Sequence, residues 1–431
     1  MRLVSSTSPE EIASWRDAVL RGIAPDGGLY IPSSLPHFSR DDKDRLRSLS
    51  FGHMASEIVR AFIGEELLAD EISALCAESF DFEVPLVQLD ETTHILELFH
   101  GPTCAFKDFG ARFMARLFRH FWGIQARPLT VLVATSGDTG SAVAQAFYDT
   151  SEAAPIRVAV LFPKGKVSDV QRRQMTTLGH NVTAFEVDGT FDDCQSLVKR
   201  ALRDDSILRQ TALTSANSIN IARLLPQMLY YAFSLMQFEE PALVVVPSGN
   251  LGNLTGGLMA HRCGFEARHW VAACNSNDVF PHYLSSGQFS PAASRETISN
   301  AMDVGNPSNF SRIVSMCGDT ASQILSGYSI SDDETLQEMA STYALTRYIL
   351  DPHTAVGARA LRTHRELYNQ RGTAILVSTA HPAKFSATVT RAINVSPALP
   401  PQLAQTLSKT EIIKPIPNSY SALVEHLLAT V

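Results

Sequence analysis

One lysine stands where its amine could act as a nucleophile, in residues 97–114. Apolar residues recur at three- and four-residue steps after a Gly-Pro pair, which predicts a helix with one face in a core. Thr103 is the expected N-cap, so Lys107 falls in the first or second turn. The helix dipole and apolar neighbours favour a neutral amine, the form that a Schiff-base nucleophile needs, although a nearby Asp108 would oppose this. Most such lysines lie on the surface, so Lys107 alone does not establish a site.

Three strand–loop–helix units that could position this lysine follow it in the chain. Each begins with a continuous apolar run rich in β-branched residues, at 130–134, 242–246 and 373–377. Further strands are expected at 157–162 and 182–187. This alternation predicts parallel sheets covered by helices on both faces. Ligands bind at the carboxyl ends of such strands, so the loops after the three runs are expected to form one shared site.

The loops suit anionic groups. Residues 248–253 open a helix and can present backbone N–H groups to one phosphate, or can be only a tight turn that uses glycine. They match neither a nucleotide P-loop nor a dinucleotide fingerprint. Residues 135–141 offer hydroxyls and N–H groups to a carboxylate or phosphate, although Asp138 could be only a helix cap. A phosphate loop together with a neutral lysine is what pyridoxal 5'-phosphate (PLP) requires.

Composition excludes several other classes of protein. The 431 residues are enough for two or three domains with a large core. A net charge of −8 without a basic stripe argues against nucleic acid as the main partner. The N-terminus lacks the apolar region of a signal peptide and no run could span a membrane, so we expect a soluble, cytoplasmic protein. Six cysteines without a Cys-x-x-Cys pair indicate reduced thiols, and no cluster has metal-ligand spacing.

Residues 99–111 closely resemble the PLP-lysine motif of the threonine synthase family. Further motifs of that family occur in order along nearly the whole chain, at 20–32, 135–141, 164–168, 189–195, 217–226, 247–253, 303–308, 351–357 and 378–385. The resemblance implies fold-type II of the PLP enzymes, an α/β fold like that of the tryptophan synthase β subunit. It also implies an N-terminal, mostly helical segment at 1–90, a large PLP-binding domain from 91–114 and 226–431, and a small α/β domain at 115–225. The cofactor would lie in the cleft between the two α/β domains.

The resemblance also implies roles for individual residues. Lys107 would bind the cofactor and act as the catalytic base, and Thr379 would contact the pyridine nitrogen. The residues matching the cofactor-phosphate loop are Ser248, Gly249, Asn250, Leu251, Gly252 and Asn253. The residues matching the substrate loop are Thr135, Ser136, Gly137, Asp138 and Thr139. Arg223 is a candidate for substrate binding, as are Lys164, Arg172 and Arg173, each of which could instead form a surface salt bridge.

The implied reaction converts O-phospho-L-homoserine and water to L-threonine and phosphate, by γ-elimination and β-addition of water. An alternative within the family is a phospho-lyase that releases 2-oxobutanoate, ammonia and phosphate from the same substrate, because the motifs alone do not distinguish the two. A nucleotide-binding protein and a catalytically silent scaffold are the remaining alternatives. The expected partner is a small-molecule substrate, without nucleic acid or membrane, and the protein would be a monomer or homodimer.

Overall fold

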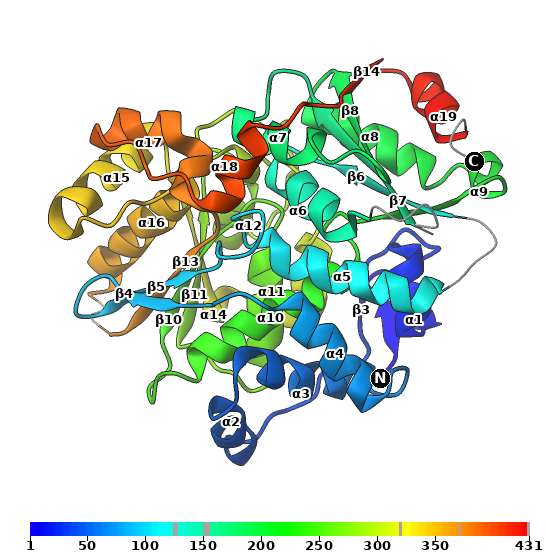
Figure 1. The fold of residues 1–431 in the computed structure, drawn as a ribbon. Helices are drawn as coiled ribbons and strands as arrows, with labels where there is room; N and C mark the ends of the chain where they lie inside the picture. The colour runs from blue at the N-terminus through cyan, green and yellow to red at the C-terminus, as the bar shows by residue number, and fades with distance from the viewer. Residues whose placement is uncertain (124–127, 150–155, 319–320, 370–371, 429–431) are drawn as a thin grey trace.

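The computed structural model describes residues 1–123, 128–149, 156–318, 321–369 and 372–428. Within these ranges the chain forms two mostly parallel sheets flanked by helices, and a small antiparallel sheet near the N-terminus (Figure 1). Strands and helices alternate along most of the chain, as the apolar runs in the sequence predicted. All five strands predicted between residues 130 and 377 are present, with ends that differ by one residue at most.

The larger sheet has six strands in the order β12-β11-β10-β13-β5-β4. Its neighbouring strands are parallel except for β4 and β5. The central strands β10 and β13 are buried along their whole length, which explains their continuous apolar sequences. The strands are β4 (Leu86–Gln88), β5 (Thr93–Glu97), β10 (Leu243–Pro247), β11 (His269–Cys274), β12 (Leu325–Ser329) and β13 (Ala374–Ser378).

The smaller parallel sheet has five strands in the order β14-β8-β7-β6-β9. The strands are β6 (Leu129–Ala134), β7 (Ile156–Pro163), β8 (Val182–Asp188), β9 (Ala212–Ser215) and β14 (Lys414–Pro417). The sequence did not predict β14, because a four-residue strand with two prolines lacks a strand pattern and is tolerated only at a sheet edge. The division of the chain into domains stays a prediction, but its small domain at 115–225 did not include this C-terminal strand.

Helices cover both faces of the smaller sheet because successive side chains of a strand point to opposite sides. Val131 and Val133 pack in one apolar cluster with α6 (Asp138–Phe147), whereas Leu132 packs in another with α8 (Phe191–Ala201) and α19 (Tyr420–Leu428). Figure 1 shows α19, near the C-terminus, beside α8. The other helices that follow β5 are α5 (Lys107–Trp122), α7 (Asp169–Thr176), α9 (Asp205–Leu208), α10 (Ile221–Leu235), α11 (Gly252–Arg262), α12 (Val279–Ser286), α13 (Phe310–Cys317), α14 (Ala321–Ile324), α15 (Asp332–Thr346), α16 (Pro352–Tyr368), α17 (Ser386–Ile393) and α18 (Pro401–Leu407), with the 3-10 helices η1 (Asn300–Met302) and η3 (Pro382–Phe385).

Residues 1–90 contain the four helices α1 (Trp15–Arg21), α2 (Arg40–Arg47), α3 (Phe51–Ile63) and α4 (Ala69–Ser79). They also contain a short antiparallel sheet, with the order β2-β1-β3, that the sequence did not predict. Its strands are β1 (Leu3–Ser5), β2 (Ile12–Ala13) and β3 (Tyr30–Pro32). Strands this short lack a period-two pattern long enough to recognise.

Helix α5 begins at Lys107, so the lysine lies in the first turn, but the predicted N-cap at Thr103 was wrong. Thr103 instead donates from its backbone N and its Oγ1 to the carboxylate of Asp108, at 2.9 and 2.7 Å. A turn precedes the helix, with Cys104 at a φ of 55° and the Phe106 N–H bonded to the carbonyl of Thr379 at 2.8 Å. This turn fixes the start of α5 against the end of β13.

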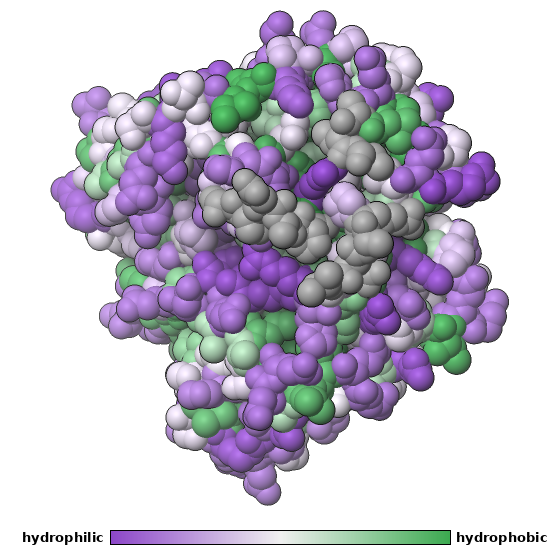
Figure 2. Space-filling view, turned by 45° about the vertical axis from the view of Figure 1, so that its right-hand side comes forward, coloured by the Kyte–Doolittle hydropathy of each residue, from purple (hydrophilic) through white to green (hydrophobic). Residues whose placement is uncertain are grey.

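Among the described residues, every helix is too short or too polar to cross a bilayer. On the face seen in Figure 2, hydrophobic residues occur in small groups among hydrophilic ones.

Candidate active site

The loops at the carboxyl ends of β6, β10 and β13 meet in one pocket between the two parallel sheets. The structure thus brings the three loops together, with the loop after β6 on the smaller sheet and the other two on the larger sheet, as the predicted cleft between two α/β domains requires. Of the residues predicted to form the site, all but Gly137 and the candidate cations Lys164, Arg172 and Arg173 line the pocket, namely Lys107, Thr135, Ser136, Asp138, Thr139, Arg223, Ser248, Gly249, Asn250, Leu251, Gly252, Asn253 and Thr379. Gly137 lies just behind it, at a φ of 143°, with its N–H bonded to Thr135.

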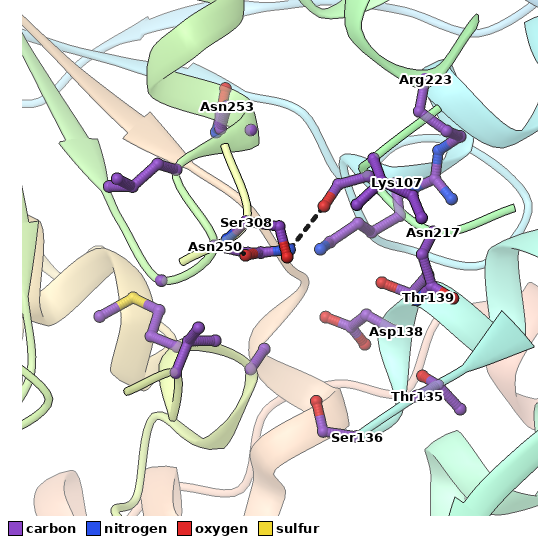
Figure 3. A pocket seen from close by; sticks show the side chains of 18 of the residues that line it. Lys107, Thr135, Ser136, Asp138, Thr139, Asn217, Arg223, Asn250, Asn253 and Ser308 are labelled. Atoms are coloured by element: carbon purple, nitrogen blue, oxygen red, sulfur yellow. Dashed lines mark hydrogen bonds between the residues drawn. The ribbon is translucent and has the colours of Figure 1, made fainter. Parts of the chain in front are cut away.

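The amine of Lys107 points into this pocket, between Asn250 and Asp138 (Figure 3). Protein encloses Lys107 except on the side that faces the pocket, where part of its surface is exposed. Burial is the main cause and the charge of Arg223 the second that lower its pKa to about 8, while Asp138 acts in the opposite direction. Asp108, which the sequence suggested might oppose the shift, is not among the groups that change the pKa of Lys107, and its carboxylate accepts both donors of Thr103. Lys107 is therefore poised to lose its proton near neutral pH.

The loop after β10 forms a concave surface of backbone groups. Leu251 takes the left-handed conformation, with a φ of 60°, and α11 begins directly after it. A Cβ on Gly249 would lie 2.6 Å from the Cα of Met302, so only glycine fits there without a shift of the backbone. Asn250 joins two other segments, since its Nδ2 donates to Ser218 at 2.6 Å and its Oδ1 accepts from the Ser308 N–H at 2.5 Å.

The loop after β6 uses some of its polar groups to hold its own shape. The Thr135 hydroxyl accepts the N–H groups of Gly137 and Gly140, at 2.9 and 2.8 Å. Asp138 is the first residue of α6 and not its N-cap, and its carboxylate points into the pocket (Figure 3). Its Oδ1 accepts from Gln171 Nε2 at 2.7 Å and pairs with Lys384 Nζ at 2.8 Å. Burial raises the pKa of this carboxyl, but Lys384 and Gln171 together hold it below its usual value.

Arg223 differs from the other predicted cations in its depth. Only 1% of its surface is exposed, Nη1 donates to the Ala216 carbonyl at 2.7 Å, and burial lowers its pKa to about 10. Arg172 and Arg173 do not line the pocket and pair with Asp169 instead. Lys164 is also absent from the lining, whereas Lys199, which the sequence did not predict, is present.

Comparison with known proteins agrees with this geometry. A family model of pyridoxal-phosphate dependent enzymes matches residues 83–380. Models of the threonine synthase N terminus and C-terminal region match residues 2–80 and 354–427. The chain is 39% identical over 428 residues to threonine synthase of Escherichia coli strain K12, covering 98% of each chain. The chain belongs to the threonine synthase family.

Solved structures of the threonine synthase family have the same fold. The crystal structure from Escherichia coli matches with a TM-score of 0.93 at 38% identity, covering 100% of both chains. A PLP-bound threonine synthase from Brucella melitensis matches with a TM-score of 0.92 at 32% identity, covering 100% of this chain and 99% of that one. The fold is therefore fold-type II of the PLP-dependent enzymes, and PLP is the cofactor.

The pocket fits the cofactor that the threonine synthase family uses. Asn253 Nδ2 is buried and has no hydrogen-bond partner among the described residues, while its Oδ1 accepts the hydroxyls of Tyr230 and Tyr231 at 2.6 and 2.7 Å. This unpartnered donor lies in the first turn of α11, where free backbone N–H groups and the helix dipole favour an anion. The glycine-lined loop provides space for a phosphate beside them, and Lys107 faces it.

His353 also lines the pocket, and its hydrogen bonds define its tautomer. The Ala301 N–H donates to its Nε2 at 3.1 Å, so Nδ1 carries the proton and donates to Asp351 at 2.8 Å. With both nitrogens engaged, the imidazole holds η1 beside the pocket. His100 and His381, the other histidines in family motifs, bond to Glu97 and to the N–H of Ala383, and neither lines the pocket.

Sequence reasoning missed several residues of the pocket. Asn217, Ser218, Ser308 and Lys199 line it; the first three lie within segments that match threonine synthase motifs, whereas Lys199 lies beyond the end of the segment at 189–195. Lys384 lies behind the wall, inside the motif at 378–385. Membership of a motif was the signal that could have found all of these except Lys199, because none of them carries a distinctive spacing of its own.

Proposed function

We propose that this chain catalyses the threonine synthase reaction, in which O-phospho-L-homoserine and water give L-threonine and phosphate. The observation that carries the proposal is the placement of Lys107, with its lowered pKa, opposite the anion-binding loop of 248–253 in one pocket. The whole-length similarity to threonine synthases supports this reaction over others of the same fold type.

We propose the following roles for the residues of the pocket. Lys107 would hold the cofactor, the loop 248–253 would bind its phosphate, and Thr379 would contact its pyridine nitrogen. The loop 135–139 would bind the substrate carboxylate, and Arg223 would attract the anionic substrate from the pocket wall. Bound PLP supplies an electron sink for the carbon atoms of the substrate amino acid. A neutral Lys107 Nζ is suited to accept the proton from the substrate Cα, because its pKa lies near the working pH.

The proposal also covers the location of the protein, its assembly and the distribution of its charge. The described residues contain no membrane-spanning helix, and we propose a cytoplasmic location. We further propose a monomer or homodimer that acts on a small-molecule substrate and does not need nucleic acid. The net charge of −8 requires that cations be concentrated at the pocket, where Lys107, Lys199 and Arg223 lie.

Product analysis tests the proposal directly. Purified protein with bound PLP is incubated with O-phospho-L-homoserine, and phosphate, threonine and 2-oxobutanoate are measured in the same samples. We expect threonine and phosphate in equal amounts. Formation of 2-oxobutanoate in step with phosphate would instead identify a phospho-lyase, and absence of phosphate release would refute the substrate. Lys107→Ala serves as the control and should lose all turnover together with the cofactor absorbance.

A further inference from the structure

A buried ion pair joins Asp138 in the pocket wall to Lys384 behind it, and the proposed roles do not use Lys384. Lys384, in η3, has an exposed side-chain fraction of 0%, and Asp138 one of 4%. Their Nζ and Oδ1 atoms are 2.8 Å apart. Burying a lysine is costly unless an anion and hydrogen bonds compensate it, so this pair has a structural reason to stay together.

Lys384 connects three segments that are far apart in the chain. Besides Asp138 at the start of α6, its Nζ donates to the carbonyl of Thr103 at 2.9 Å, in the turn before α5. Gln174 Nε2 donates to the same carbonyl at 3.0 Å, and Gln171 Nε2 donates to Asp138 Oδ1 at 2.7 Å. The ammonium therefore ties the turn that precedes the catalytic lysine to the loop opposite it.

The two oxygens of the Asp138 carboxylate have different surroundings. Oδ1 accepts from both Lys384 and Gln171, whereas no described residue donates to Oδ2. In Figure 3 the carboxylate projects toward the centre of the pocket, next to the amine of Lys107. One oxygen is fixed by the protein, and the other is left for a donor in the pocket.

We propose that Lys384 is a positioning residue that holds Asp138 as a pocket-wall acceptor for an ammonium or hydroxyl group of the bound molecules. The same contact offsets part of the charge of Asp138, so that an anionic substrate does not meet an unpaired carboxylate. This deepens the proposed function and rests on it only for the kinetic part of the test below.

Loss of Lys384 should change the state of Lys107. Asp138 already raises the pKa of Lys107, against the effects of burial and of Arg223. Without its ammonium partner, the carboxylate would be freed to turn toward the amine of Lys107, the cation beside it in the pocket. The other titratable groups that act on the pair are Cys104, Asp108, His353 and His381. None of these replaces the ammonium, so the pKa of Lys107 should rise.

The first test measures this change in the pKa of Lys107 and does not depend on catalysis. The protein is freed of PLP and treated with cyanate at a series of pH values, and carbamylation of the Lys107 peptide is followed by mass spectrometry. We expect Lys384→Met to raise the pH of half-maximal rate by about one unit. The double variant Asp138→Asn with Lys384→Met should return it to the original value or below, since no carboxylate remains. An unchanged midpoint in Lys384→Met would overturn the proposal.

The second test is a double-mutant cycle on kcat/KM with O-phospho-L-homoserine. We expect Lys384→Met to lower kcat/KM by about 100-fold, and by no more than about threefold when Asn already replaces Asp138. Equal losses in both backgrounds would show that Lys384 acts on packing and not through Asp138, and would overturn the proposal. If the single variant fails to fold, the comparison of Asp138→Asn with the double variant still decides.

A matched control removes an ion pair without burial. Arg60 pairs with Glu57 at 2.9 Å on the surface of α3, with an exposed side-chain fraction of 54%. Arg60→Met should leave both the carbamylation midpoint of Lys107 and kcat/KM within about twofold of the original, because exposed pairs contribute little. If the proposed substrate is wrong, the kinetic test fails for all variants while the carbamylation test still gives its answer.

Discussion

At the scale of single residues, the reactivity of Lys107 comes from its surroundings and not from its own chemistry. Burial accounts for most of the lowered pKa, and Arg223 adds to it from the pocket wall. A lysine with a pKa of about 8 is neutral in about a tenth of the molecules at pH 7, against fewer than about one in a thousand for a surface lysine. The neutral fraction grows as the pH rises through 8.

Replacing Arg223 should therefore make the lysine a weaker nucleophile near neutral pH. In Arg223→Met the repulsion between the two cations is lost, so the pKa of Lys107 should rise above 8. The carbamylation rate of Lys107 would then reach its half-maximum at a higher pH, which peptide mass spectrometry measures. The exposed Lys409 in the same samples is the internal control and should not shift. A lower midpoint in the variant would contradict the assigned role of Arg223.

A second prediction concerns the imidazole that supports η1. His353→Leu leaves the Ala301 N–H without its acceptor, which should lower the free energy of unfolding by about 1–3 kcal/mol. His353→Gln keeps an oxygen near the position of Nε2, so it should lower the free energy of unfolding clearly less than His353→Leu does. Urea unfolding followed by circular dichroism measures both variants. Equal losses for Leu and Gln would show that the hydrogen bond to Ala301 is not what His353 contributes.

At the scale of elements, the loop between β10 and α11 depends on close approach of two backbones. In Gly249→Ala the new Cβ would lie 2.6 Å from the Cα of Met302, and a backbone atom cannot move aside as a flexible side chain can. We expect PLP affinity, measured by absorbance titration, to fall by about tenfold or more as the loop shifts.

The matched control is Gly52, a glycine in the first turn of a helix. Gly52 in α3 has open space around the position of a Cβ, so Gly52→Ala should leave PLP affinity unchanged. It should also stabilise the fold by about 0.5–1 kcal/mol, because alanine favours a helix. If Gly249→Ala binds PLP as tightly as Gly52→Ala does, the contact with Met302 does not constrain the loop.

At the scale of the whole molecule, the C-terminal part of the chain closes the smaller sheet. Ile416 is the one buried residue of β14 and packs with residues of β8, α8 and α19. Ile416→Ala should lower the free energy of unfolding by about 2–4 kcal/mol, as other large-to-small core substitutions do. Chemical unfolding measures this, and Lys414→Ala, on the exposed part of the same strand, should change it by less than about 0.5 kcal/mol. If Ile416→Ala lowers the free energy of unfolding by less than about 0.5 kcal/mol, β14 is not firmly packed against the sheet.

Much of the site could be predicted because the chemistry requires particular residues at fixed places along the chain. A lysine after a turn, a glycine-rich loop at a helix start and strands with continuous apolar runs are local patterns. Each is determined by backbone sterics or by burial on both faces of a sheet. The sequence alone therefore determined the parallel α/β architecture and the family, and it predicted the lysine and the glycine-rich loop that the structure brings into one pocket.

Only the tertiary structure decided how these local patterns meet. It added β14 to the smaller sheet and moved the start of α5 to Lys107. It also paired Asp138 with Lys384 and brought Arg223 close enough to Lys107 to lower its pKa. These features depend on contacts between residues up to hundreds of positions apart, and their energies arise from burial and from charges in a shared interior. No spacing along the chain encodes such contacts, which is why the sequence could not supply them.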